Sequence, residues 1–211
     1  MIMFFDVHSH TFKPNSKQTI VNLEFDDAEE FFASTRENFV SVGFHPCFLD
    51  VFSENNFAKL KRWATDKRVK TLGECGLDKY SRFDLKTQIL VFERQVILSE
   101  KAGKSLVIHC IGRANELLAI KRAMKPAQLW IIHGFRGKAQ LAEQFLKADC
   151  ALSFGEFFNV ESVKITPLDK LFIETDESAK DIADIYFDIA KIKNCKIENL
   201  KAGQEFFENF S

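Results

Sequence analysis

The chain has 211 residues, of which 46% are hydrophobic and 28% are charged, and its formal net charge is −1. This balance is typical of a globular protein with a sizeable core, and no linker or low-complexity segment interrupts it, so we expect residues 1–211 to form one domain. The near-zero net charge excludes a global basic field, so any contact with nucleic acid must be local.

Cysteine usage narrows the class of protein further. The five cysteines form no CxxC pair and are odd in number, which argues against a zinc ribbon and against a disulfide framework. The sequence shows no signal-peptide pattern and no apolar run of about 18 residues, the length that spans a membrane. We therefore expect a reduced, cytoplasmic enzyme that does not contact membranes. The sequence does not indicate its oligomeric state.

Short apolar runs alternate with stretches of helical spacing along the chain. Gly103 follows the longest periodic stretch and predicts a helix end there. Strands alternating with helices predict a parallel sheet, either closed into a barrel or doubly wound. The predicted strands cover 3–7, 19–23, 39–44, 70–74, 105–109, 129–133, 150–154 and 170–175, and the predicted helices cover 27–37, 55–65, 85–102, 115–124, 138–146, 182–193 and 198–207.

One junction departs from the alternation. Only the polar stretch "TFKPNSKQ", residues 11–18, separates the first two predicted strands. Parallel neighbours need a crossover of about a dozen residues or more, usually with a helix. The first βα unit is therefore expected to be truncated, and strand 19–23 could be irregular or antiparallel, with the barrel incomplete.

All five histidines of the chain lie at the carboxyl ends of predicted strands, and so do Glu74 and Asp176. One histidine at a strand end is usually an ordinary polar residue. In an α/β barrel, however, these strand ends converge on one rim, so seven such residues predict a shared metal site. The histidines are His8, His10, His45, His109 and His133.

The residue types indicate which ions would bind. Imidazole and carboxylate ligands suit zinc, manganese, iron or nickel, and the part of the site that is rich in carboxylates suits magnesium. Six of these seven residues are the potential ligands, which are too many for one open tetrahedral ion, so two ions that share a bridging ligand fit better. The six are His8, His10, Glu74, His109, His133 and Asp176. Strand alternation also predicts that four residues near the start share one face: Phe4, Asp6, His8 and His10.

An ordered set of motifs resembles the TatD family of metal-dependent deoxyribonucleases, within the amidohydrolase-like TIM barrels. The motifs are "DVHSH", "VGFHP", "LGECGLDKY", "VIHC", "IIHGFRG", "LSFG" and "FIETDES". The resemblance covers nearly the whole chain and implies a TIM-type (β/α) barrel with two divalent ions (Mg, Mn or Zn) on its rim. It also implies a nuclease that hydrolyses DNA, at a strand end or in a single strand, in the 3′-to-5′ direction with a metal-activated water.

The resemblance assigns roles to particular residues. His8 and His10 would hold the first ion, and His109 and His133 the second. Glu74 would bridge the two ions, and Asp176 would ligate the first and handle the proton of the attacking water. His45 would reach the scissile phosphate, and Asp6 would orient a ligand from the second shell.

Several side chains have two interpretations. Arg113, Arg136 and Lys138 follow the ligand strands closely enough to bind phosphate, or they are solvated surface charge. Cys75 and Cys110 directly follow two ligands, where strand alternation favours packing over thiol ligation.

The aromatic residues and one basic stretch also have two interpretations. The 23 phenylalanines favour core filling over a base-stacking platform. The stretch "KLKRWATDKRVK" favours a solvated helix face, with Trp63 in the core, over a surface that binds DNA.

Two rival functions remain open. The same site could hydrolyse a carboxylic ester, such as that of a D-aminoacyl-tRNA. Alternatively, the chain could be a catalytically degenerate barrel that acts as a binding protein.

Overall fold

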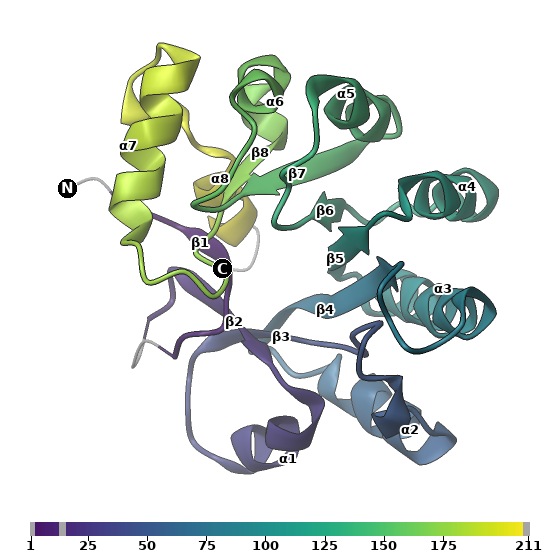
Figure 1. Cartoon of the computed structure of the whole chain (residues 1–211). Coiled ribbons are helices and arrows are strands. Elements are labelled where there is room, and N and C mark those ends of the chain that lie inside the picture. Colours follow the sequence, from purple (N-terminus) through teal and green to yellow (C-terminus); the bar gives the residue numbers. More distant parts are fainter. Residues whose placement is uncertain (1–2, 13–15, 209–211) are drawn as a thin grey trace.

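The structure, a computed structural model, describes residues 3–12 and 16–208. Eight strands form one sheet in which each strand pairs in parallel with the next one along the chain. The predicted parallel sheet is confirmed, and it is the closed alternative (Figure 1). The strands are β1 (Asp6–Ser9), β2 (Thr19–Leu23), β3 (Phe39–Val42), β4 (Val69–Asp78), β5 (Ser105–Ile111), β6 (Trp130–Ile132), β7 (Cys150–Phe154) and β8 (Leu171–Ile173).

The barrel closes where the chain just after β8 meets β1. Ser9 and Asp176 form a parallel bridge; the Asp176 N–H donates to the His8 carbonyl, and the His10 N–H donates to the Asp176 carbonyl, both at 3.0 Å. β2 runs parallel to β1 with a shift in register, so the expectation of an antiparallel strand is wrong and that of an irregular pairing is confirmed. Because Ser9 and Asp176 bridge the first and last strands, the expectation of an incomplete barrel is wrong. The truncated first unit is confirmed for residues 10–12 and 16–18, which contain no helix; residues 13–15 lie outside the described part.

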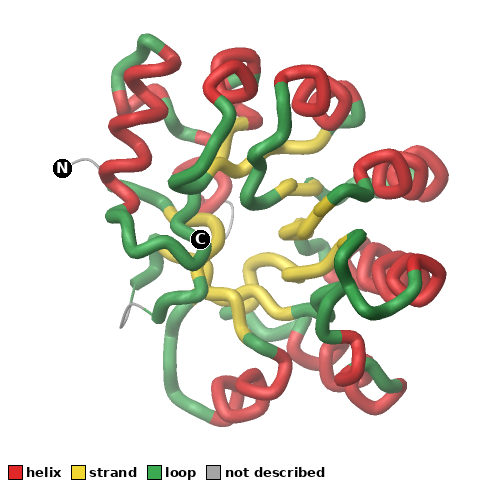
Figure 2. Tube along the Cα trace, in the orientation of Figure 1, coloured by secondary structure: helices red, strands yellow, loops and turns green. Residues whose placement is uncertain are grey.

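Helices surround the sheet (Figure 2). The longest begins and ends as predicted, because the Asp84 carboxylate caps its first turn by accepting from the Thr87 N–H at 2.9 Å, and Gly103 ends it at a φ of 63°. The helices are α1 (Phe25–Ala33), α2 (Glu54–Trp63), α3 (Leu85–Ala102), α4 (Ala114–Met124), α5 (Ala139–Lys147), α6 (Val160–Ile165), α7 (Ile182–Lys193) and α8 (Ala202–Glu208).

Three of these helices differ from the prediction, and one of them, α1, lies at Phe25–Ala33 and ends four residues before the predicted end at Glu37. The six-residue helix α6 was not predicted, because one and a half turns are too short to show a helical period. The predicted helix 198–207 is instead a 3-10 turn, Ile197–Asn199, followed by α8. Within the described residues, no helix combines the length and the apolar character needed to cross a membrane.

The apolar core has two layers, one between the sheet and its helices and one inside the barrel. Helix α8 belongs to the inner layer, where the Phe207 ring packs 5.0 Å from Phe5 and 6.0 Å from Phe39. Among the described residues, eleven phenylalanines and Trp63 are buried, which confirms their predicted role in the core. Since α8 packs at the start of β1, this end of the barrel is filled, and polar side chains gather at the carboxyl rim.

Candidate metal centre

The structure brings all five histidines of the chain together around one carboxylate. Glu74 extends from β4 and is 7% exposed, and each histidine places a ring nitrogen within 3.6 Å of one of its oxygens. The distances are 2.6 Å for His133 Nε2, 3.1 Å for His109 Nδ1, 3.4 Å for His10 Nε2, 3.5 Å for His45 Nε2 and 3.6 Å for His8 Nε2. Glu74 and His109 lie within β4 and β5, and the other histidines lie at the ends of β1, β3 and β6. Closure of the barrel brings β1 to the other strands of this set.

One half of the cluster consists of His8, His10 and Asp176. Each Nε2 of the two histidines lies 3.7 Å from Asp176 Oδ1. Asp176 adopts a φ of 55°, a left-handed conformation that aspartate tolerates better than most residues, and its backbone hydrogen bonds to β1 hold it there. The bonds that close the barrel therefore also position this half of the cluster.

His8 is the clearest sign that the cluster is built for a cation. It has no exposed surface, and neither of its ring nitrogens has a hydrogen-bond partner. A buried polar atom without a partner costs about 1–3 kcal/mol, so such atoms are rare in folded proteins. A divalent ion held between His8, His10 and Asp176 would satisfy one of these nitrogens, and the donor set therefore fits a metal.

The other half of the cluster consists of His109 and His133, each with a carboxylate behind it. His109 Nε2 lies 2.8 Å from Asp78 Oδ2 and its Nδ1 lies 3.1 Å from Glu74 Oε1, so a neutral ring that donates to Asp78 has its lone pair on Nδ1, facing Glu74. His133 Nδ1 lies 3.5 Å from the fully buried Glu174, while its Nε2 faces Glu74. Carboxylates in this position orient metal-ligating imidazoles and make them more basic.

His45 differs from the other four histidines. Its Nδ1 accepts the backbone N–H of Cys47 at 3.1 Å, so the proton of the neutral ring must lie on Nε2, which points to Glu74. A nitrogen that carries a proton donates a hydrogen bond and cannot bind a metal. His45 is therefore suited to donate to an oxygen of a substrate.

The charges in the cluster stabilise one another. Burial by itself would raise the pKa of Glu74, but the charge of His133 and hydrogen bonds from His10, His109 and His133 hold it well below its usual range. Burial would lower the pKa of His133, but Glu74 and Glu174 together raise it well above its usual range. In the metal-free cluster an anion thus lies beside two histidines whose pKa values are raised, His10 and His133, and a divalent cation would replace their positive charge.

The carboxylate and imidazole atoms form several overlapping groups that could each hold an ion. One consists of His8, His10 and Asp176, and another of His45, Glu74 and His109, in which Glu74 and His109 are the available ligands while His45 keeps its Nε2 proton; these two groups share no residue. The remaining groups are His8, Glu74 and His133, and His133, Glu174 and Asp176. The described part of the rim therefore offers ligands for more than one ion.

A glycine allows β4 and β5 to approach closely enough for this geometry. Gly76 pairs with His109 and has a φ of 141°, and a Cβ atom there would collide with the His109 carbonyl oxygen. β1 contains a comparable irregularity, a register shift between Asp6 and Ser9. Because of it, Phe4 packs on α7 at 5.2 Å from Tyr186 while His8 faces the cluster, so the prediction that Phe4 and His8 share one face is wrong.

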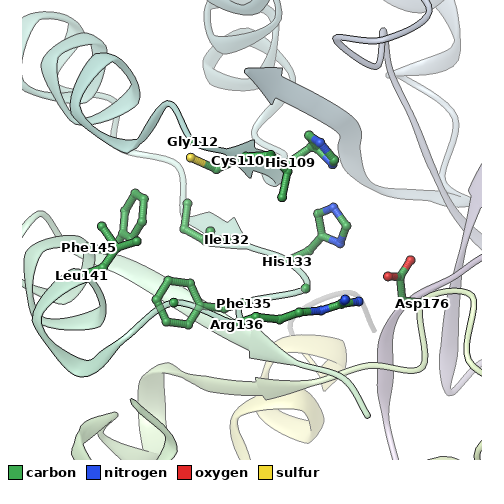
Figure 3. Close-up of a pocket in the computed structure, with 13 residues that line it drawn as sticks. His109, Cys110, Gly112, Ile132, His133, Phe135, Arg136, Leu141, Phe145 and Asp176 are labelled. Carbon is green, nitrogen blue, oxygen red and sulfur yellow. The ribbon is translucent and has the colours of Figure 1, made fainter. Parts of the chain in front are cut away.

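The structure places the other predicted site residues at different distances from the cluster. Asp6 is buried and accepts from the Thr175 N–H at 3.0 Å and from its hydroxyl at 2.7 Å, which fixes the segment that carries Asp176. Arg136 is exposed and reaches from the loop after β6 toward Asp176 (Figure 3). Arg113 donates to Glu116 at 2.9 Å within the first turn of α4, so its guanidinium is engaged there.

Two cavities adjoin the cluster. One of about 410 Å³ contains the histidines themselves, except His8. The other, of about 370 Å³, lies between the loop after β6 and helix α5, with an apolar floor that includes Phe135 and Phe145 (Figure 3). His109, His133 and Asp176 line both cavities, so a substrate bound at the cluster would have room on the α5 side.

The cysteines beside the ligands take no part in these groups. Cys75 is fully buried and its thiol donates to the Val107 carbonyl at 3.6 Å. Burial raises the pKa values of both Cys75 and Cys110, which disfavours the thiolate that a metal requires. Among the described residues, no cysteine belongs to a candidate group, and the packing interpretation is confirmed for Cys75.

Sequence analysis missed three residues that support the cluster. Asp78 and Glu174 lie behind two of the histidines, and the Asn22 side-chain oxygen accepts the backbone N–H of Glu74 at 3.0 Å. A signal for the carboxylates was present, because Asp78 follows Glu74 by four residues and Glu174 precedes Asp176 by two, which is the spacing of one strand face. No local signal marks Asn22, since its contact depends on the pairing of β2, β3 and β4.

Fold and cluster together define a class: a (β/α)₈ barrel with a histidine and carboxylate centre at its carboxyl rim. The model of the TatD related DNase family matches residues 6–201, so the chain belongs to that family. The recognition made from the motifs is thereby confirmed.

Individual relatives are consistent with this assignment. YabD of Bacillus subtilis, an uncharacterized metal-dependent hydrolase, is 31% identical over 147 residues, which cover 65% of this chain and 58% of YabD. The 3′-5′ ssDNA/RNA exonuclease TatD of Erwinia billingiae is 29% identical over 147 residues, which cover 64% of this chain and 56% of that protein. The chain thus spans less than two thirds of the length of these relatives.

Solved structures show the same fold. That of YjjV, a TatD homolog from Escherichia coli, superposes with a TM-score of 0.83 at 17% identity and covers 99% of this chain and 97% of that one. A TatD family hydrolase from Entamoeba histolytica superposes with a TM-score of 0.77, also at 17% identity. The expected TIM-type barrel is therefore confirmed.

Proposed function

We propose that this chain is a divalent-metal-dependent phosphodiesterase that removes nucleotides from single-stranded nucleic acid, with DNA as the first substrate to test. The observation that carries the proposal is the shared carboxylate Glu74, contacted by all five histidines, beside Asp176 on an open rim. Two sets of nitrogen ligands that share one acid can hold two ions close together, as two-metal phosphoester hydrolysis requires.

The proposal assigns the donors to two ions, which could be Mg, Mn or Zn. His8, His10 and Asp176 would hold the first ion, His109 and His133 the second, and Glu74 both. When bound, the ions would lower the pKa of the attacking water and stabilise the charge that develops on the phosphate. Asp176 is the ligand best suited to accept the proton of that water, because its side chain is 24% exposed whereas Glu74 is 7% exposed.

Two further side chains would act on the phosphate. His45 Nε2 carries a proton in the neutral ring and would donate it as a hydrogen bond to a phosphate oxygen, where it stabilises charge in the transition state. Arg136 is exposed beside Asp176 and would bind a neighbouring phosphate with its planar guanidinium. Arg113 would contribute only if its ion pair with Glu116 opened.

Relatives support the substrate class. One bears the name 3′-5′ ssDNA/RNA exonuclease and another, from human, the name 3′-5′ RNA nuclease. We extend this activity to the present chain as a proposal, because the matches cover 56% and 19% of those proteins. The proposal includes a single hydrolase domain over residues 1–211, and the cytoplasmic location stays a prediction.

The test is a comparison of two substrates with one enzyme preparation. Purified protein with Mg²⁺, Mn²⁺ or Zn²⁺ is incubated with 3′-labelled single-stranded DNA and, separately, with a D-aminoacyl-tRNA. Loss of label from DNA with an intact ester supports the nuclease; ester cleavage with intact DNA supports the carboxylic-ester alternative. Protein that retains no divalent ion and hydrolyses neither substrate would be a degenerate barrel.

A further inference from the structure

The exposed aromatic side chains of the described residues are concentrated at the carboxyl rim. Five aromatic side chains are exposed, and four of them lie on segments that follow a strand: Phe12 after β1, Phe48 after β3, Tyr80 after β4 and Phe157 after β7. The fifth, Phe187, lies within α7. A single exposed apolar residue needs no explanation, but exposed rings gathered on the rim that carries the metal centre indicate a binding surface.

Two of these rings border the centre from different sides. Phe48 is 54% exposed, lines the cavity that contains the histidines, and its ring lies 5.2 Å from that of His45. Phe157 is 62% exposed and lines another cavity on the β7 side, separate from the two described above. Both cavities include Asp176, so a strand whose phosphodiester bond lies at the centre would extend past both rings.

Arg136 links the second ring to the phosphate backbone. Its guanidinium carbon lies 5.3 Å from the centre of the Phe157 ring, a cation–π distance, and its side chain points toward Asp176 (Figure 3). A cation beside an open aromatic face is complementary to one nucleotide, because the cation can bind the phosphate while the ring stacks on the base. The remaining face of Phe157 is open to solvent, as its exposure shows.

We propose that Phe48 and Phe157 stack on unpaired bases on either side of the scissile phosphodiester, so that the centre selects single strands without selecting their sequence. This inference rests on the proposed nuclease function. Every base has a π-face, which makes stacking tolerant of sequence, whereas the bases of a duplex already stack on one another. The net charge of −1 supplies little general attraction for a polyanion, so stacking would provide affinity that charge does not.

The experiment measures binding separately from hydrolysis. Metal-loaded protein is titrated into a fluorescent single-stranded oligothymidine and into an oligonucleotide of equal length without bases, with Ca²⁺ to slow cleavage, and anisotropy reports the dissociation constant. We expect Phe48→Ala and Phe157→Ala each to weaken binding of the oligothymidine by about 5- to 100-fold and to leave binding of the abasic strand unchanged.

Two further variants of Phe157 and one control identify stacking as the cause. Phe157→Trp should keep the affinity, since it keeps an aromatic face, and Phe157→Leu should lose it although its apolar volume is similar. Phe187→Ala, an equally exposed ring on α7, should behave as the wild type. Equal losses on both oligonucleotides, or none, would overturn the stacking role. Failure to release label from DNA would instead overturn the nuclease proposal.

Discussion

Glu74→Gln tests the central feature of the site, because it removes one charge while keeping the shape of the side chain. In the metal-free protein the substitution takes the anionic partner from imidazoles at 2.6–3.6 Å. Removing one member of a buried ion pair costs about 3–5 kcal/mol, and we expect the lower end because histidine can release its proton. At about 2–4 °C per kcal/mol for a chain of this size, the apo melting temperature should fall by about 6–12 °C.

The same variant should lose the response to metal. An ion at a concentration of 100 times its dissociation constant stabilises the wild type by about 2.7 kcal/mol, which raises its melting temperature by about 5–11 °C. Because the proposal makes Glu74 a ligand of both ions, we expect metal to raise the melting temperature of the variant by less than about 2 °C under the same conditions.

The assay is thermal unfolding of both proteins, with EDTA and with a Mn²⁺ titration, followed by metal analysis of the dialysed samples. Glu177→Gln is the matched control, since it removes an exposed acid that lines the same cavity. The control should keep the wild-type metal shift. A Glu74→Gln protein that also kept this shift would refute the shared-ligand role.

Three other predictions concern the same centre. Asp176→Asn should keep much of the metal but lower kcat by about 100-fold or more, measured by single-turnover hydrolysis; a fully active variant would exclude the proton role. Asp78→Asn, which weakens the partner of His109 Nε2, should lower metal affinity by about 10- to 100-fold in a chelator competition; wild-type affinity would contradict the orienting role. The pKa of His133 is raised above its ordinary 6.5, so its contribution to metal-free stability is complete below pH 6.5 and is lost as the pH rises through the raised value. The lowered pKa of Glu74 acts in the opposite sense, since its contribution is present above pH 4.5 and is lost as the pH falls through the lowered value. Metal binding requires unprotonated imidazole, so the melting shift that Mn²⁺ produces should grow between about pH 5.5 and pH 8.5, and a constant shift would contradict this linkage.

The periodic parts of the chain could be predicted because local patterns specify them. The capping aspartate and Gly103 limit α3 to the predicted residues, and the apolar runs define the strands whichever partner they pair with. The convergence of the histidines also follows from sequence, since five strand-end positions have one meeting place in a parallel barrel.

Contacts between distant strands could not be predicted in the same way. The parallel pairing of β2 despite its short connection depends on the whole sheet, because that strand is held by β3 as well as by β1. The face on which His8 lies depends on a register shift in β1, which no local pattern marks.

The sequence by itself determined the set of candidate ligands, because the side-chain types and their positions along the predicted strands are local properties. Only the tertiary structure decided how the ligands differ. The hydrogen bond from the Cys47 backbone makes His45 a donor, Asp78 fixes the free nitrogen of His109, and burial leaves His8 with two unpartnered nitrogens. Each of these distinctions arises from groups that folding brings into contact, and the contact determines where a proton or a lone pair lies.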